Sequence, residues 1–251
     1  MKKWLLLIVA TMMCMVLVAC QTTEETSIER TFLAGYEVGE FEKKSARILM
    51  NLKSDGTAEW YVGIVEQGQH HTELYQGTYT LGENEEYDET ISFACTYADG
   101  KIIETKEAVI IDNIFETPFY LFGEMENKIK FYETAPASMD GDVYVGYLTK
   151  TSGMGAMTYA YSLCLKEDSS FDVSIMQMAS VMHVWGSTGG TYIIDGETIT
   201  FTYDILTTEG EIVAEGEIAE GVNYSSTTFS TAFNIQQSSM RASNAVFIRI
   251  K

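Results

Sequence analysis

The sequence predicts an all-β protein made of two tandem antiparallel β domains. Three observations predict it. Short segments alternate apolar and polar residues, which is the pattern of half-buried strands. A set of motifs recurs in the same order in both halves of the chain. Tyr and Phe are frequent and Pro is almost absent, a composition that favours strands over loops and helices.

The N-terminus reads as a signal peptide. A basic start, Met1 to Lys3, precedes an apolar run from Trp4 to Ala19. This run is somewhat shorter than the ~20 residues that a helix needs to span a bilayer. The polar residues that follow Cys20 carry no positive stop-transfer flank. An ordinary signal peptide with a chance cysteine, or an uncleaved anchor, is the alternative.

The end of that run, Leu17-Val18-Ala19-Cys20, resembles the lipobox of bacterial lipoproteins. The resemblance implies that residues 1–19 form a helical signal peptide and are removed, and that Cys20 receives a diacylglycerol. Residues 20–30 would then be a lipidated tether at the extracytoplasmic face of the cell envelope. Two or more acyl chains hold a protein on a membrane durably. The expected partner is therefore the membrane itself, through the diacylglyceryl and palmitate groups of this cysteine.

An internal repeat divides the mature chain. Residues 52–57 match residues 165–170, and Gly-Thr-Tyr at 77–79 recurs at 190–192, both at an offset of 113. Two further pairs complete the alignment: Thr90–Phe93 with Thr198–Phe201, and Gly35-Tyr36 with Gly146-Tyr147. We expect β domain 1 at residues 31–135 and its repeat, β domain 2, at residues 141–251, with seven or eight strands in each.

The alternation also predicts which side chains face inward. In the second half Ile199, Phe201 and Tyr203 share one face of a strand, because side chains alternate with period two. The aligned strand of the first half places Cys95 on its inner face. The same reasoning places Cys164 on an outer face. A disulfide between these two cysteines is therefore not expected.

Each half resembles the bacterial lipocalin-like domains. The shared features are an opening Gly-aromatic strand, an L-x-x-D-G-T hairpin, a G-T-Y segment and an alternating strand. The lipocalin G-x-W signature is absent. The resemblance implies a β-barrel with a ligand site inside it. An immunoglobulin-like β-sandwich is the alternative, although its buried cysteine pair with a tryptophan is missing.

The composition and motifs argue against an enzyme. The formal net charge is −20, which repels nucleic acid. The mature chain has three histidines, no G-x-S-x-G or H-E-x-x-H motif, no zinc-ligand spacing and no phosphate-binding glycine loop. We therefore expect no catalytic residue, no metal and no cofactor.

A candidate site lies between the third and fourth strands of each repeat. His70 aligns with His183 at the offset of 113. The second-half segment around it is apolar, and methionine adapts to irregular ligands. Barrel mouths are common ligand sites. The predicted ligand-binding residues are His70, His183, Met176, Met178, Met182 and Trp185. The alternative is that the apolar ones only cap the core and that the histidine match is coincidental.

The leading hypothesis is a membrane-anchored, non-catalytic lipoprotein that binds a small, apolar ligand inside a lipocalin-like barrel. A surface adhesion or scaffold protein with packed β domains is the alternative, and an envelope hydrolase is the least favoured. The volume inside the barrels distinguishes the first two, because ligand pockets usually enclose several hundred Å³.

Overall fold

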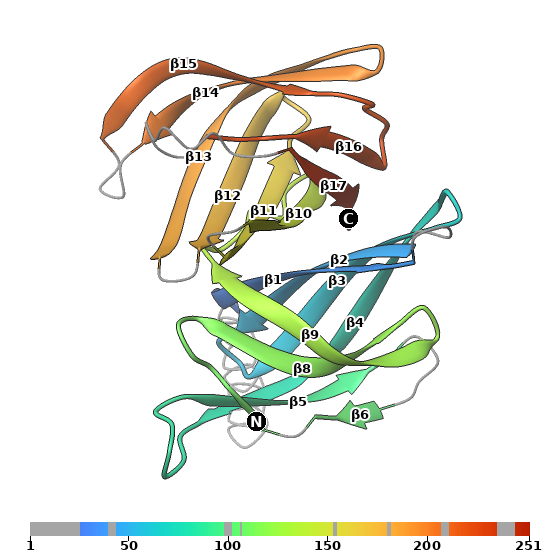
Figure 1. Cartoon of the computed structure of the whole chain (residues 1–251), viewed down its shortest axis with the longest axis vertical. Helices are drawn as coiled ribbons and strands as arrows, with labels where there is room; N and C mark the ends of the chain where they lie inside the picture. Colours follow the sequence, from blue (N-terminus) through green and yellow to red (C-terminus); the bar gives the residue numbers. More distant parts are fainter. Residues whose placement is uncertain are drawn as a thin grey trace, which may run out of the picture.

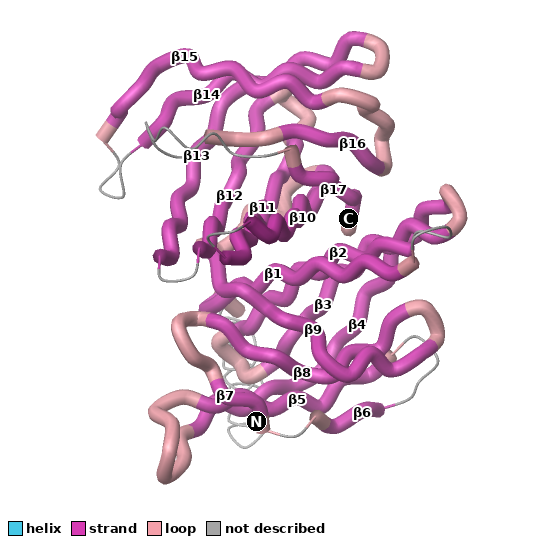
Figure 2. Tube along the Cα trace, in the orientation of Figure 1, coloured by secondary structure: helices cyan, strands magenta, loops and turns pink. Residues whose placement is uncertain are grey.

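The computed structural model describes residues 26–39, 44–97, 102–105, 107–152, 155–179, 182–206, 211–234 and 244–251. Every helix or strand assigned within these ranges is a β-strand, and the strands form two curled antiparallel sheets (Figures 1 and 2). The predicted all-β fold with two tandem domains is confirmed. The predicted signal peptide and Cys20 lie outside the described residues.

Domain 1 is a half-barrel with the strand order β6-β5-β4-β3-β2-β1-β9-β8, and β7 pairs with β5. Its strands are β1 (Ile28–Val38), β2 (Lys44–Lys53), β3 (Thr57–Glu66), β4 (Gln69–Gly82), β5 (Thr90–Thr96), β6 (Ile102–Glu104), β7 (Ala108–Val109), β8 (Ile114–Leu121) and β9 (Glu124–Thr134). β1 begins at Ile28, so the last three residues of the predicted tether belong to the sheet.

Domain 2 repeats this path with the order β15-β14-β13-β12-β11-β10-β17-β16. Its strands are β10 (Asp142–Ser152), β11 (Gly155–Leu165), β12 (Ser170–Ala179), β13 (Met182–Asp195), β14 (Thr198–Leu206), β15 (Ile212–Gly221), β16 (Thr228–Thr231) and β17 (Ala245–Arg249). A two-bond bridge between Val222 and Ser230 draws the ends of β15 and β16 together. Residues 135–141 link the two domains.

Aromatic side chains fill the concave face of each half-barrel. The predicted inward residues, such as Phe93 and Phe201, are buried in these cores. A stacked pair closes each core at the same place in the strand order. Phe115 and Phe131 pair across β8 and β9 with ring centroids 5.1 Å apart, and Phe229 and Phe247 pair across β16 and β17 at 5.0 Å. The repeat therefore extends to its last strands, where the sequence match is too short to detect.

The repeated Gly-Thr-Tyr segment has a structural role in both domains. The Tyr79 hydroxyl donates to the Lys53 carbonyl oxygen at 3.0 Å, and the Tyr192 hydroxyl donates to the Lys166 carbonyl oxygen at 2.9 Å. Each tyrosine thus ties β4 or β13 to the end of a neighbouring hairpin. A Cβ at Gly77 or Gly190 would overlap a backbone carbonyl oxygen of the next strand. This close approach leaves no room for a side chain at the glycine of the motif in either domain.

One pair in the sequence alignment is wrong by one residue. Ala34 pairs with Ile48, whereas Gly146 pairs with Tyr161, which is the counterpart of Ile48. The counterpart of Gly146 is therefore Ala34, and Gly35 lies on the opposite face. A one-residue slip reverses the face of a strand. Both sites contain glycine for unrelated packing reasons, which made the match misleading.

The two cysteines face the directions that the alternation predicted. Cys95 is buried in the core of domain 1. Cys164 is buried on the outer face of domain 2, against residues of both domains and the linker. Both thiols are free.

Candidate functional site at the domain junction

The convex faces of the two half-barrels pack against each other. In Figure 1, β1 and β2 lie beneath β10, β11 and β17. The contact forms a third apolar cluster, which we call the junction core. Its buried members are Leu33, Leu49, Tyr132, Ala137, Val143, Val145, Ala160, Cys164, Met176 and Ile250. Equivalent positions of the repeat contribute from both sides, since Leu33 and Val145 occupy the same place in their domains.

A fully buried arginine connects the two domains. The Arg47 guanidinium donates to the Ala46 carbonyl oxygen at 3.0 Å and to a Glu37 carboxylate oxygen at 2.7 Å, both in domain 1. It also donates to the carbonyl oxygens of Val246 at 3.3 Å and Tyr147 at 3.4 Å, both in domain 2. Burial lowers the pKa of Arg47, and the Glu37 carboxylate opposes that shift. The cation therefore holds backbone atoms of both domains.

Two glycines flank this arginine in the sheet and allow the domains to meet. Arg47 pairs with Gly35 on β1 and with Gly63 on β3. A Cβ at Gly35 would overlap the Tyr147 ring, and a Cβ at Gly63 would overlap the Arg249 carbonyl oxygen. The row formed by Gly35, Arg47 and Gly63 was not identified from the sequence. A glycine that makes room for another domain has the same appearance in a single strand as a glycine that is needed for a turn.

His70 lies at the edge of the junction. Its Nε2 is 2.8 Å from the Arg249 carbonyl oxygen of domain 2. His183 occupies the matching position of the repeat, because His70 pairs with Val65 and His183 pairs with Met178. The two histidines therefore occupy equivalent positions in the strand pairing of their domains, as the sequence alignment predicted. The His70 side chain therefore makes a contact between the two domains. The side chain of His183 is not among those that the structure describes.

Two of the predicted methionines, Met176 and Met178, lie on the convex face of domain 2. Met176 is buried in the junction core and Met178 packs against it, so neither lines the interior of the half-barrel. Met182 and Trp185 are in β13, where Trp185 pairs with Met176. The side chains of Met182 and Trp185 are not among those that the structure describes. The predicted role of these residues in ligand binding stays a prediction.

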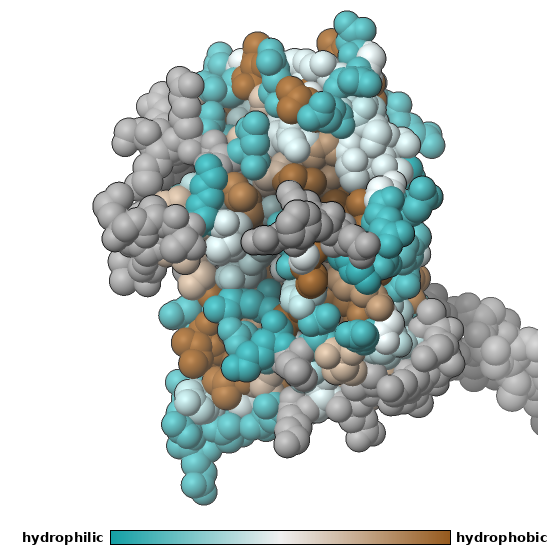
Figure 3. Space-filling view, turned by 45° about the vertical axis from the view of Figure 1, so that its right-hand side comes forward, coloured by the Kyte–Doolittle hydropathy of each residue, from teal (hydrophilic) through white to brown (hydrophobic). Residues whose placement is uncertain are grey.

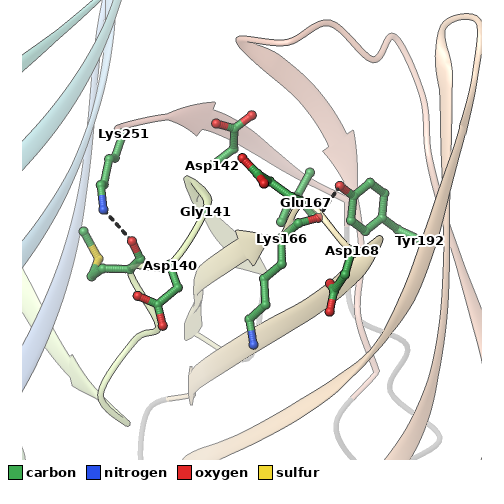
Figure 4. A pocket seen from close by; sticks show the side chains of 10 residues that line it. Asp140, Gly141, Asp142, Lys166, Glu167, Asp168, Tyr192 and Lys251 are labelled. Atoms are coloured by element: carbon green, nitrogen blue, oxygen red, sulfur yellow. Dashed lines mark hydrogen bonds between the residues drawn. The ribbon is translucent and has the colours of Figure 1, made fainter.

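A polar cleft of about 880 Å³ borders the linker on domain 2 (Figure 4). Asp140 and Asp142 contribute from the linker and the start of β10, and the hairpin between β11 and β12 contributes Lys166, Glu167 and Asp168. The wall is completed by Met139, Gly141, Leu165, Tyr192 and Lys251. Figure 4 shows the Lys251 ammonium directed at the linker backbone, where it donates to the Met139 carbonyl oxygen. The cleft is therefore a surface of mixed charge rather than an apolar pocket.

Three ionisable groups of the cleft have pKa values that are shifted by their surroundings. Hydrogen bonds from Ser170 lower the pKa of Asp168, and the hydrogen bond to Asp172 raises the pKa of Lys166. Burial raises the pKa of Tyr192. Each shift moves the group away from neutral pH. A general acid or base works best with a pKa near the working pH, so these shifts do not favour Asp168, Lys166 or Tyr192 for proton transfer at neutral pH.

The described residues contain no group of three or more His, Cys, Asp or Glu side chains with metal-binding geometry. In the same ranges, no helix has the length and hydropathy of a membrane span. Comparisons with protein-family models, with curated proteins and with solved structures found no match to this chain.

Proposed function

We propose that this protein is a lipid-anchored, extracytoplasmic and non-catalytic scaffold, in which two packed β domains form one rigid unit that recognises partners with its outer surface. The observation that carries this proposal is the aromatic packing inside both half-barrels. It favours the scaffold hypothesis over an apolar ligand held within a barrel.

The interior rings are in direct contact with one another. In domain 1, the Trp60 and Phe93 centroids are 5.5 Å apart. In domain 2, the Phe233 ring lies 4.9 Å from that of Phe201 and 5.8 Å from that of Phe171. Aromatic pairs in protein cores have centroids at 4.5 to 7 Å. Rings at these distances are in contact, so no apolar ligand fits between the members of these pairs.

The outer surface offers the features that a scaffold needs. Hydrophilic residues cover much of the face in Figure 3, in keeping with the net charge of −20. The cleft of Figure 4 lies against the linker and is lined mostly by polar and charged residues. The buried contacts of Arg47 with both domains support a fixed arrangement of these surfaces, since breaking them leaves polar groups unsatisfied.

Titration with a fluorescent fatty acid tests the choice between the two hypotheses. We expect the protein to show no saturable binding, because no interior ring can leave its neighbours without loss of packing. The Phe247→Ala variant removes a ring from the core of domain 2 and should lose about 3–5 kcal/mol of unfolding free energy. It provides the matched control, because the cavity opened there should admit benzene, which the packed core of the unaltered protein excludes. Stoichiometric binding by the unaltered protein would refute the packed-scaffold proposal.

Cys20→Ala tests the anchor. We expect the variant to leave the membrane fraction and to lose the added mass of the diacylglycerol, because no other residue would carry the lipid. Cys14→Ala is the control, since it alters the other N-terminal cysteine and should leave membrane attachment unchanged. Fractionation of cells followed by mass spectrometry measures both properties. Retention of Cys20→Ala in the membrane at the level of the unaltered protein would argue for an uncleaved anchor instead.

A further inference from the structure

A small cavity of about 200 Å³ lies under the linker, on the convex face of domain 2. The linker covers it with Pro136, Ala137 and Ser138. Strands β11, β12 and β13 form its floor. This cavity is separate from the cleft of Figure 4 and contains none of the residues that line that cleft.

Three serines cross the floor of the cavity in one row. Ser162 on β11 pairs with Ser174 on β12, which pairs with Ser187 on β13. Residues that are paired across an antiparallel sheet project from the same face. Ser162 and Ser174 are buried, whereas Ser187 is exposed at the mouth. The row therefore runs from the covered end of the cavity to solvent.

Domain 1 shows that the fold itself does not require these hydroxyls. The same row of the repeat contains Leu49, Tyr61 and Leu74, paired in the same register. Leu49 and Tyr61 pack in or against the junction core. Two domains with the same topology thus carry an apolar row in one case and a row of three serines in the other. The strand pairing of this fold therefore does not require hydroxyl groups at these three positions.

The buried end of the row contains an unsatisfied hydroxyl. Ser162 is 3 % exposed and its Oγ has no hydrogen-bond partner in the protein. A buried polar group without a partner costs about 1–3 kcal/mol, and buried polar side chains are paired in most proteins. A ligand with its own hydroxyl groups can supply the missing partner.

Charge and size define the class of ligand. Asp172 is the only carboxylate that lines the cavity, and the Lys166 ammonium neutralises it at 2.6 Å. The cavity therefore favours neither anions nor cations. Its volume corresponds to about seven water molecules at ~30 Å³ each, and it is smaller than the ~300 Å³ at which pockets for drug-sized molecules begin.

We propose that this cavity binds a small neutral polyhydroxyl compound, either a polyol or a monosaccharide, through the Ser162, Ser174 and Ser187 hydroxyls. The assignment goes beyond the scaffold function and does not depend on it. Hydroxyl groups serve as donors and acceptors at once, which matches a ligand that is itself a ring or chain of hydroxyls.

Ligand-observed NMR on the mature full-length protein, held in a detergent without sugar groups, tests the proposal with glycerol and ribose as probes. We expect saturable binding of at least one probe. Ser187→Leu introduces the residue that domain 1 has at this position and should block the mouth, weakening binding about tenfold or more, equivalent to ~1.4 kcal/mol. Ser174→Ala removes one hydroxyl without adding volume and should also weaken binding.

Thr202→Leu is the matched control, because Thr202 is exposed on β14 and does not line the cavity. This variant should bind like the unaltered protein, and thermal unfolding should show that all three variants are folded. Absence of saturable binding of both probes overturns the proposal. It is also overturned if Ser174→Ala and Ser187→Leu bind unchanged, or if methylammonium or phosphate competes with equal effect.

Discussion

Replacement of Arg47 by methionine should split the thermal unfolding of this protein into two transitions. The Arg47 guanidinium is the buried group that donates to the domain 2 carbonyl oxygens of Val246 and Tyr147. Methionine retains much of the apolar stem but removes every donor. The two carbonyl oxygens then lose the hydrogen bonds that Arg47 donates inside the junction. The Glu37 side chain is 61 % exposed and can be hydrated.

The expected cost is about 2–4 kcal/mol, within the range for buried acceptors that lose a charged donor. Differential scanning calorimetry measures it, since loss of coupling separates the two domains into independent transitions. Arg30→Met is the control. Arg30 forms its ion pairs with Glu89 and Glu133, both in domain 1. The Arg30→Met variant should destabilise domain 1 and leave the two domains unfolding together. A single transition for Arg47→Met at the temperature of the unaltered protein would contradict the assigned role.

Gly63→Val should produce the second large effect. A Cβ at this position overlaps the Arg249 carbonyl oxygen, which is backbone and therefore has no rotamer to change. β17 pairs with both β10 and β16, so its movement would disturb two ladders. Forced overpacking costs about 1–3 kcal/mol, and we expect the upper end of that range because backbone must move.

Urea unfolding measures this loss of stability. Gly82→Ala is the control, because a Cβ at Gly82 approaches only the Thr90 hydroxyl. That variant should unfold within about 0.5 kcal/mol of the unaltered protein. An unchanged urea midpoint for Gly63→Val would show that β17 can withdraw from domain 1 without cost, and the rigid junction would then be refuted.

Much of the architecture could be predicted because strand alternation is local. Residues two apart share a face whatever the rest of the chain does, so Phe93, Phe201, Cys95 and Cys164 were assigned to the correct faces. The Asp-Gly and Asp-Ser hairpins recur for a similar reason. Asp55 accepts hydrogen bonds from Thr57, and Asp168 accepts them from Ser170, within a few residues of each other.

The candidate site was less predictable. Alternation states that Met176 and Met178 lie on one face of β12, but both faces of that strand are covered. One face of β12 packs into the core of domain 2, and the face that carries Met176 and Met178 packs against domain 1. The apolar character of the segment suggested a ligand site, and the structure adds that Met176 and Met178 lie at an interdomain contact. His70 likewise touches a strand 179 residues away.

By itself, the sequence determined the all-β class, the duplication and the inward faces, because these depend on periodicity and on turns within a few residues. It also predicts the lipid anchor at Cys20, which a short motif specifies. Only the tertiary structure decided that the convex faces meet, that Arg47 is buried between Gly35 and Gly63, and that three serines share a covered cavity. These features depend on which strands lie side by side and which faces of the two domains meet, and such long-range contacts leave no pattern within a single strand.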